Sequence, residues 1–138
     1  LHSKDEVAAY RANGLPGQPD NGDGFVLLIH GSTGLFAVGW HSETYVADTD
    51  GVRGKDAFDM HLARLTEAFG LPDEEARNVS PMVADFYDCL SKVWCGTWAA
   101  VWRDLPGLAE VRIQLVGQEP GIGFVRIGYV RPQVADTN

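Results

Sequence analysis

The stretch WCGTWAAVWRD (residues 94–104) carries three of the four tryptophans in the 138-residue sequence. Trp94, Trp98 and Trp102 recur every four residues, and side chains four apart lie on nearly the same side of an α-helix. Upstream, Ser80 and Pro81 are typical of an N-cap and a first helical position. The sequence therefore predicts a long helix over residues 81–103.

The apolar face of this predicted helix is broad. It holds eight residues: Val83, Phe86, Tyr87, Leu90, Trp94, Trp98, Val101 and Trp102. Such a face either covers a β-sheet or forms a surface for a ligand or a partner. Three indoles in nine residues are more aromatic volume than a small helix-on-sheet core usually holds. We expect most of the face to be core, with Trp102 emerging at an edge to line a pocket or a subunit interface.

Short apolar or alternating segments on either side of this helix predict β-strands. There are four of them: 25–30, 35–41, 108–116 and 124–131. The first two are joined by the turn GSTG (31–34), which pairs His30 with Leu35 and places His41 near Gly24. Residues 43–48 either continue the second strand past a bulge or form a short third strand.

Three further helical segments are predicted. Residues 54–70 form an amphipathic helix that ends at Gly70, and its apolar stripe consists of Phe58, Leu62, Leu65 and Phe69. Residues 4–12 read as a short N-terminal helix, and 72–78 as a helical turn with acids near its positive end.

These elements predict an α+β fold. An antiparallel sheet of about four strands, in the order hairpin–helix–helix–hairpin, would have two amphipathic helices packed on one face. Residues 1–24 would hold the short N-terminal helix and a loop rich in glycine and proline. Residues 25–132 would form a single α+β domain, and 133–138 a disordered tail.

The charge balance limits the partners. The formal net charge is −8 and the pI is near 4.8. Binding to a nucleic-acid backbone or to an anionic membrane surface requires clustered Lys and Arg, so neither is expected. A basic protein partner is compatible with this charge.

The two cysteines, Cys89 and Cys95, are six residues apart. On a continuous helix they would be separated by about 9 Å of rise and point to different sides. A disulfide between them is then excluded. Two free thiols favour a reducing compartment, which predicts a cytoplasmic protein.

Catalytic and metal-binding patterns are weak. No Cys, His, Asp or Glu residues have zinc spacing, and no phosphate-binding loop occurs. His30 and His41 would share a sheet face but lie roughly 20 Å apart, too far to chelate one metal. His61 flanks the apolar stripe of helix 54–70 and reads as structural. We therefore predict no metal and no cofactor.

The order of elements, together with VRIQLVGQEPGIGFVRIGY (residues 111–129), is similar to the tunnelling fold of pterin and purine enzymes. In that family a Glu placed like Glu119 anchors the ring nitrogens of the substrate. The zinc histidines of the family are not reproduced, because only His30 and the stretch GWHSETY (39–45) stand at their places. The resemblance implies a metal-free activity and sheet edges that pair between subunits.

Two functions follow as expectations. The first is a non-catalytic protein-interaction or assembly module with an acidic surface, which binds a partner protein or a second copy of itself through its edge strands. The second is a small-molecule enzyme or binder with a pocket at the helix–sheet or subunit boundary. Its candidate ligand-binding residues are Glu119, His30, His41, Glu43, Tyr129 and Trp102.

Overall fold

The computed structural model describes residues 7–10, 25–30 and 36–131. In chain order the elements are β1 (Val7–Tyr10), β2 (Phe25–His30), β3 (Phe36–His41), α1 (Val52–Phe69), β4 (Glu74–Val79), α2 (Phe86–Leu90), β5 (Gly96–Leu105), β6 (Leu108–Glu119) and β7 (Ile122–Arg131). Neither helix in these ranges is both long and apolar enough to cross a membrane.

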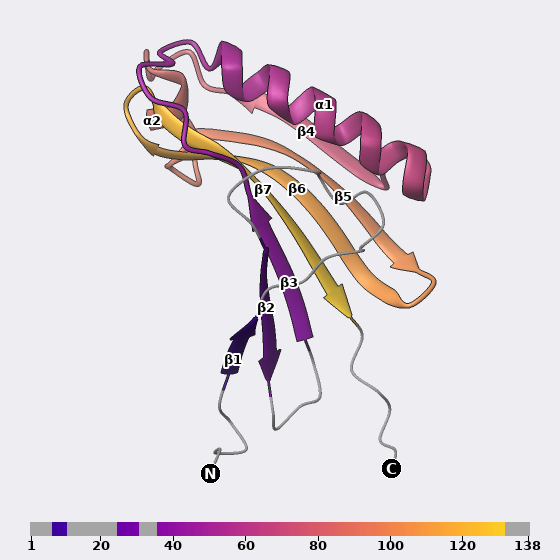
Figure 1. Cartoon of the computed structure of the whole chain (residues 1–138). Coiled ribbons are helices and arrows are strands. Elements are labelled where there is room, and N and C mark those ends of the chain that lie inside the picture. The colour runs from indigo at the N-terminus through magenta and orange to yellow at the C-terminus, as the bar shows by residue number, and fades with distance from the viewer. Residues whose placement is uncertain (1–6, 11–24, 31–35, 132–138) are drawn as a thin grey trace.

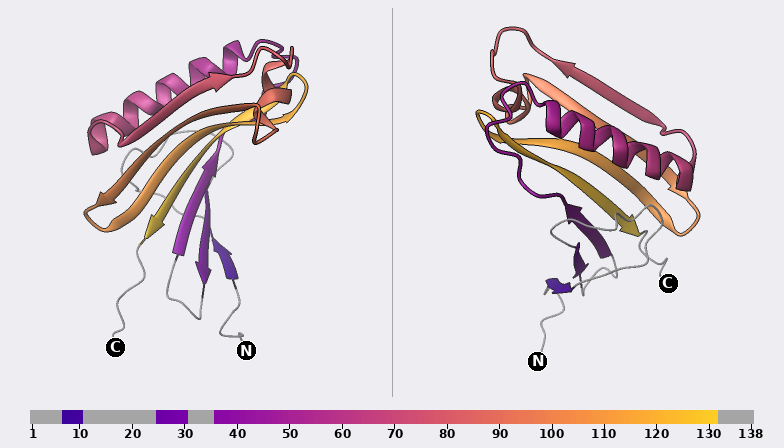
Figure 2. Two further views of the ribbon diagram at one scale, coloured as in Figure 1. Left: turned by 180° about the vertical axis from the view of Figure 1, so that it is seen from behind. Right: turned by 45° about the horizontal axis from the view of Figure 1, so that its top comes forward.

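The strands form one antiparallel sheet in the order β1-β2-β3-β7-β6-β5-β4. Helices α1 and α2 both pack on one face of the sheet, over the part formed by β3, β7, β6, β5 and β4 (Figure 1). The predicted α+β class is confirmed: an antiparallel sheet with two helices packed on it. Strands β5–β7 are long and curved, and α1 lies along them (Figure 2).

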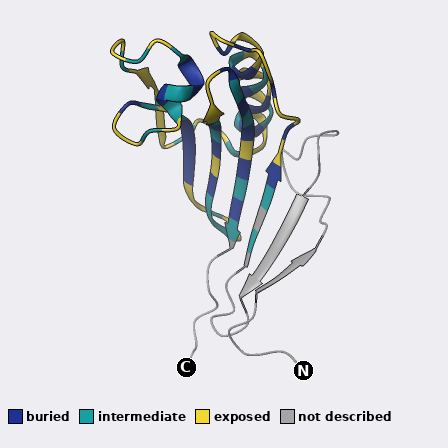
Figure 3. Cartoon of the chain, turned by 90° about the vertical axis from the view of Figure 1, so that its left-hand side faces the viewer, coloured by how far each residue is buried: buried dark blue, intermediate teal, exposed yellow. Residues whose placement is uncertain are grey.

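The core lies between α1 and strands β5–β7. The alternation predicted for the two C-terminal strands is confirmed, because one side of each strand is buried and the other is not (Figure 3). The inward residues are Val111, Ile113, Leu115, Val125, Ile127 and Tyr129. On α1, Phe58 and Leu65 are fully buried, and Leu62 and Phe69 pack against the same core.

The predicted helix over 81–103 is wrong. The helix α2 ends at Leu90, and residues from Gly96 onward form the strand β5. A spacing of four places residues within about 40° of one another on a helix, but it also places them on one side of a strand, because four is a multiple of two. Backbone pairing with β6, in which Trp102 lies opposite Val111, makes this segment a strand and not a helix.

Two shorter helical predictions are also wrong. Residues predicted as a helical turn at 72–78 contain the strand β4, which pairs with β5. Within the predicted helix 4–12, the described residues 7–10 form the strand β1, which pairs with β2. In both places pairing with a neighbouring strand overrides the local preference of the sequence.

The predicted pairing of the first hairpin is confirmed, since Phe25 lies opposite Trp40. Residues 43–48 form no strand and contribute one bridge, between Tyr45 and Gly123. The turn 31–34, the loop rich in glycine and proline, and the tail 133–138 lie outside the described residues.

Candidate interaction surface

Large apolar side chains are exposed near the end of β4 and in the segment between α2 and β5. Val93 is 97% exposed, Met82 87% and Trp94 68%. We call Val93 and Trp94 the tip. A valine and a tryptophan exposed side by side are not accounted for by the core of this domain, so the tip is the strongest candidate for a contact surface.

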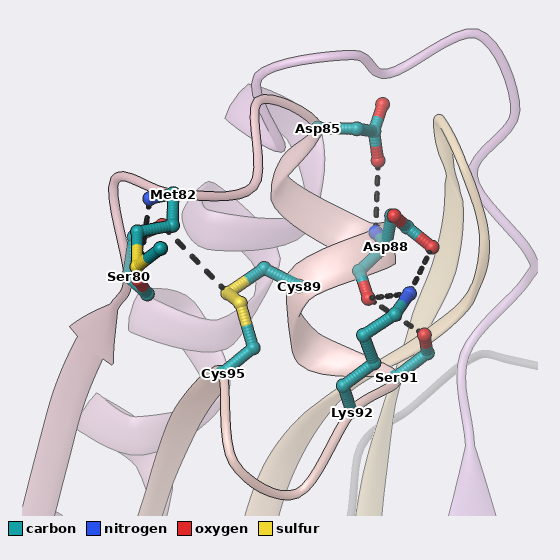
Figure 4. The surroundings of a disulfide bond; sticks show 8 residues. All are labelled: Ser80, Met82, Asp85, Asp88, Cys89, Ser91, Lys92 and Cys95. Carbon is teal, nitrogen blue, oxygen red and sulfur yellow. Dashed lines mark hydrogen bonds and ion pairs between the residues drawn. A yellow bond between two sulfur atoms is a disulfide. The ribbon is translucent and has the colours of Figure 1, made fainter.

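A disulfide closes the loop that bears the tip. Cys89 and Cys95 are joined by an S–S bond of 2.04 Å with a Cα–Cα distance of 5.1 Å (Figure 4). The predicted exclusion of this bond is wrong, because the helix ends at Leu90 and the chain turns back. The cytoplasmic prediction rested on free thiols and has therefore lost its premise.

Main-chain bonds hold this loop against the sheet. The N–H of Cys95 donates to the carbonyl of Lys92 at 3.0 Å, and the N–H of Ser80 donates to the carbonyl of Cys95 at 2.9 Å. Cys89 and Cys95 are themselves buried. The base of the loop is thus fixed while Val93 and Trp94 point into solvent.

The charges beside the tip compensate one another. The ammonium of Lys92 lies 2.7 Å from the carboxylate of Asp88, and the main-chain N–H of Asp88 donates to Asp85, the N-cap of α2, at 2.8 Å. The one lysine inside the disulfide loop is therefore paired, and the tip offers an apolar contact rather than a charged one.

Of the six residues predicted to bind a ligand, two are buried in the core. Trp102 is buried and its indole N–H donates to the carbonyl of Gly70 at 2.7 Å, so Trp94 and not Trp102 is the tryptophan that emerges. Tyr129 is buried in the core, and burial raises its pKa.

Three of the other four are exposed. Glu119 is exposed at the end of β6, and Glu43 is exposed in the segment after β3. His41 is exposed, with its ring edge-on to Phe124 at 5.9 Å. The side chain of His30 lies outside the described residues.

A hollow of about 480 Å³ lies on the sheet face opposite the helices. Its lining combines small residues of β4 and β5 with charged ones: Asp73, Glu74, Glu75, Ala76, Thr97, Ala99, Val101 and Arg112. None of the five predicted ligand-binding residues whose side chains are described lines it. Within the described ranges, no group of three or more His, Cys, Asp or Glu side chains could hold a metal ion.

His61 is buried, as its place beside the apolar stripe suggested. It is 3% exposed, packs edge-on against Trp40 with ring centroids 4.8 Å apart, and its Nδ1 has no hydrogen-bond partner among the described residues. Burial, with a smaller contribution from the charge of Arg64, lowers its pKa to about 4. This histidine is a core residue that folds in its neutral form.

His61 is therefore expected to make stability fall as the pH falls. In the unfolded chain a histidine has a pKa of about 6.5, so between about pH 6.5 and 4 the unfolded state binds a proton that the folded state does not. The expected loss is about 2 kcal/mol on going from pH 7 to pH 5. Urea unfolding of the wild type and of His61→Leu measures it.

The leucine variant should lose much less stability over this pH range, and at neutral pH should stay within about 1 kcal/mol of the wild type because a nitrogen without a hydrogen bond is removed. Equal pH slopes for the two proteins would contradict the assignment.

No family model matches this chain, and comparisons with curated proteins and with solved structures also found no match. The function must be argued from the surface itself. One signal in the sequence pointed to the tip. Two cysteines enclose Val93 and Trp94, and where no helix runs through such a segment this pattern is typical of a loop closed by a disulfide.

Proposed function

We propose that this protein is a non-catalytic interaction module that binds a partner protein through the tip. The observation that carries the proposal is the exposure of Val93 and Trp94 on a loop closed by the disulfide. Tryptophan is enriched among the residues that dominate binding energy. A loop held in one conformation also loses less entropy on binding than a free one.

The partner should offer an apolar pocket on a basic surface. The tip supplies the apolar contact, and Lys92, the one lysine of the disulfide loop, is neutralised by Asp88. The chain as a whole has a net charge of −8. Charge of this sign favours encounters with a basic protein and disfavours acidic ones.

The perturbed titratable groups support a non-catalytic role. The pKa of Asp48 is lowered and that of Tyr87 is raised, and these two side chains bind each other. His61 lies inside the core. Each shift thus accompanies a structural contact and needs no reaction to explain it. The small-molecule alternative has less support, because two of its expected residues, Trp102 and Tyr129, are buried in the core.

Photo-cross-linking tests the proposal. A benzophenone amino acid is placed at position 94 of the full oxidised chain, and in a control protein at position 46, where Val46 is also exposed (54%) but lies far along the chain from the tip. After irradiation in an extract of the source cells, the cross-linked proteins are identified by mass spectrometry. We expect a basic protein captured from position 94 and not from position 46.

The captured protein is then purified and titrated calorimetrically against three variants. Trp94→Ala is expected to weaken binding by about thirtyfold or more, as for a central aromatic contact. Val93→Ser should weaken it less, and Val46→Ser not at all. The proposal fails if both positions capture the same proteins, if neither captures any, or if Trp94→Ala binds as tightly as the wild type.

A further inference from the structure

Strand β4 lies at the edge of the sheet. Among the described residues it is the last strand and pairs only with β5, so the other side of its backbone has no strand partner there (Figure 2). The N–H of Ser80 donates to the carbonyl of Cys95, which fixes the alternation of the ladder. Glu74, Ala76 and Asn78 therefore bond toward β5, and the intervening residues direct their N–H and C=O groups outward.

Charges along this edge match those of a second, antiparallel copy. Glu75 and Arg77 stand on either side of Ala76, and the guanidinium of Arg77 lies 2.8 Å from the carboxylate of Glu75 and 2.6 Å from that of Asp59 on α1. A two-fold axis at Ala76 would place Glu75 of each copy opposite Arg77 of the other, in two identical pairs. Opposite charges directly across a ladder stabilise it, whereas an axis at Glu75 or at Arg77 would oppose like charges.

The same axis would cover exposed apolar residues at both ends of the strand. Leu71, 84% exposed, lies just before β4, whereas Val79 (37% exposed) ends the strand and Met82 (87% exposed) lies just after it. In an antiparallel pair the segment before β4 of one copy lies beside the segment after β4 of the other, so Leu71 of one copy would lie near Val79 and Met82 of the other. A polar centre with apolar ends is self-complementary, as a two-fold interface requires.

Charged residues on an edge strand can also serve only to keep other chains away. That function does not account for Leu71, Val79 and Met82, which are exposed on either side of the charges.

We propose that the chain forms a two-fold dimer in which β4 pairs antiparallel with β4 of a second copy about Ala76 and extends the sheet across both. This interface uses the β4 edge and not the tip, so it does not depend on the proposed function.

Charge reversal tests the pairing in the full oxidised chain. Light scattering should give twice the 15.0 kDa chain mass for the wild type. Glu75→Arg would oppose two arginines, and Arg77→Glu two glutamates, so each should weaken dimerisation about tenfold or more. The double variant E75R/R77E restores opposite charges across the axis but lacks the ion pair between Arg77 and Asp59, so it should dimerise more tightly than either single variant and less tightly than the wild type. A wild type that stays monomeric at millimolar concentration, or single variants that dimerise as well as the wild type, would overturn the proposal.

Cysteine cross-linking tests the register separately. On the axis, residue 76 faces itself in a non-hydrogen-bonded pair with a Cα separation of about 4.5 Å, which a disulfide can span. Ala76→Cys should therefore link two copies on mild oxidation. Asn78→Cys, on the same strand and the same side, would face Glu74 and should not. Equal cross-linking of the two variants, or none from Ala76→Cys, would refute the two-fold axis at Ala76.

Discussion

Replacing Gly117 by alanine is expected to lower the free energy of unfolding by about 3 kcal/mol or more. A Cβ at this position would lie 2.0 Å from the carbonyl oxygen of Tyr87 and 2.9 Å from the main-chain nitrogen of Ser91. Both are backbone atoms of α2 and its C-cap, so no side chain can rotate to make room. The helix would have to move away from β6.

Two glycines that face each other across β6 and β7 allow α2 to approach the sheet closely. Gly117 on β6 lies opposite Gly123 on β7, where a Cβ would meet the ring of Tyr87 at 2.3 Å. Tyr87 is also held in place by a hydrogen bond, because its hydroxyl donates to the carboxylate of Asp48 at 2.8 Å. Moving α2 would therefore also disturb a buried hydrogen bond.

Gly128→Ala is the matched control. Gly128 lies on the same hairpin, but no described atom lies within 4 Å of the position its Cβ would take. Its replacement should change the free energy of unfolding by about 0.5 kcal/mol or less. The measurement is guanidinium unfolding of the two variants. Equal unfolding midpoints for Gly117→Ala and Gly128→Ala would show that the close approach of α2 does not constrain position 117.

The sequence predicted the C-terminal hairpin well for a physical reason. Residues 108–116 and 124–131 alternate with a period of two, which no helix can satisfy, and the structure buries the predicted side of both. Helix α1 was equally clear, because the stripe from Phe58 to Phe69 fits a period near 3.6 and no strand.

The segment 81–103 failed because its tryptophan spacing satisfies both periods. Ser80 and Pro81 then supplied a helix start that the chain does not use, and α2 begins after Asp85 instead. The same error led to the wrong prediction for the cysteines, since a continuous helix would have kept Cys89 and Cys95 apart. It also led to the wrong prediction for two tryptophans: Trp102 was expected at an edge and is buried, whereas Trp94 is exposed.

Strand β4 could not be predicted from its own residues. Its sequence EEARNV is rich in charge and poor in residues that favour strands, and almost all of it is exposed. It is a strand because its backbone pairs with that of β5. This pairing exists only in the assembled sheet and cannot be read from the residues of β4 alone. The candidate surfaces, the tip and the β4 edge, both lie in segments whose secondary structure was predicted wrongly, 81–103 and 72–78.

Replacing Asp48 by alanine should destabilise the protein by about 3 to 4 kcal/mol. Asp48 is 6% exposed and its carboxylate accepts three hydrogen bonds. Tyr87 donates its hydroxyl at 2.8 Å, and the main-chain N–H groups of Arg53 and Gly54 donate at 3.1 Å. Because the N-cap of α1 is Gly51 and has no side chain, Asp48 supplies the cap from outside the helix.

Asp50→Ala is the control, because Asp50 is exposed on the same turn and should be replaceable at a cost of about 0.5 kcal/mol or less. Tyr87→Phe removes one of the three bonds and should cost about 1 to 2 kcal/mol. If Asp48→Ala were no more costly than Asp50→Ala, the carboxylate would not be the group that joins α1 to α2.

The pH dependence separates the charge of Asp48 from its shape. Burial by itself would raise the pKa of this carboxyl, but the hydrogen bonds from Tyr87 and from the N–H groups of Arg53 and Gly54 outweigh it, so the pKa is lowered. A lowered pKa contributes stability that is present above the unfolded value of about 3.9 and is lost as the pH falls through the folded value. The difference in unfolding free energy between the wild type and Asp48→Asn should therefore be constant from about pH 7 to pH 5 and should shrink below about pH 4. A difference that stays the same at about pH 3 would mean that the pKa of Asp48 is equal in the folded and unfolded states, and that ionisation of Asp48 adds nothing to the stability of the fold.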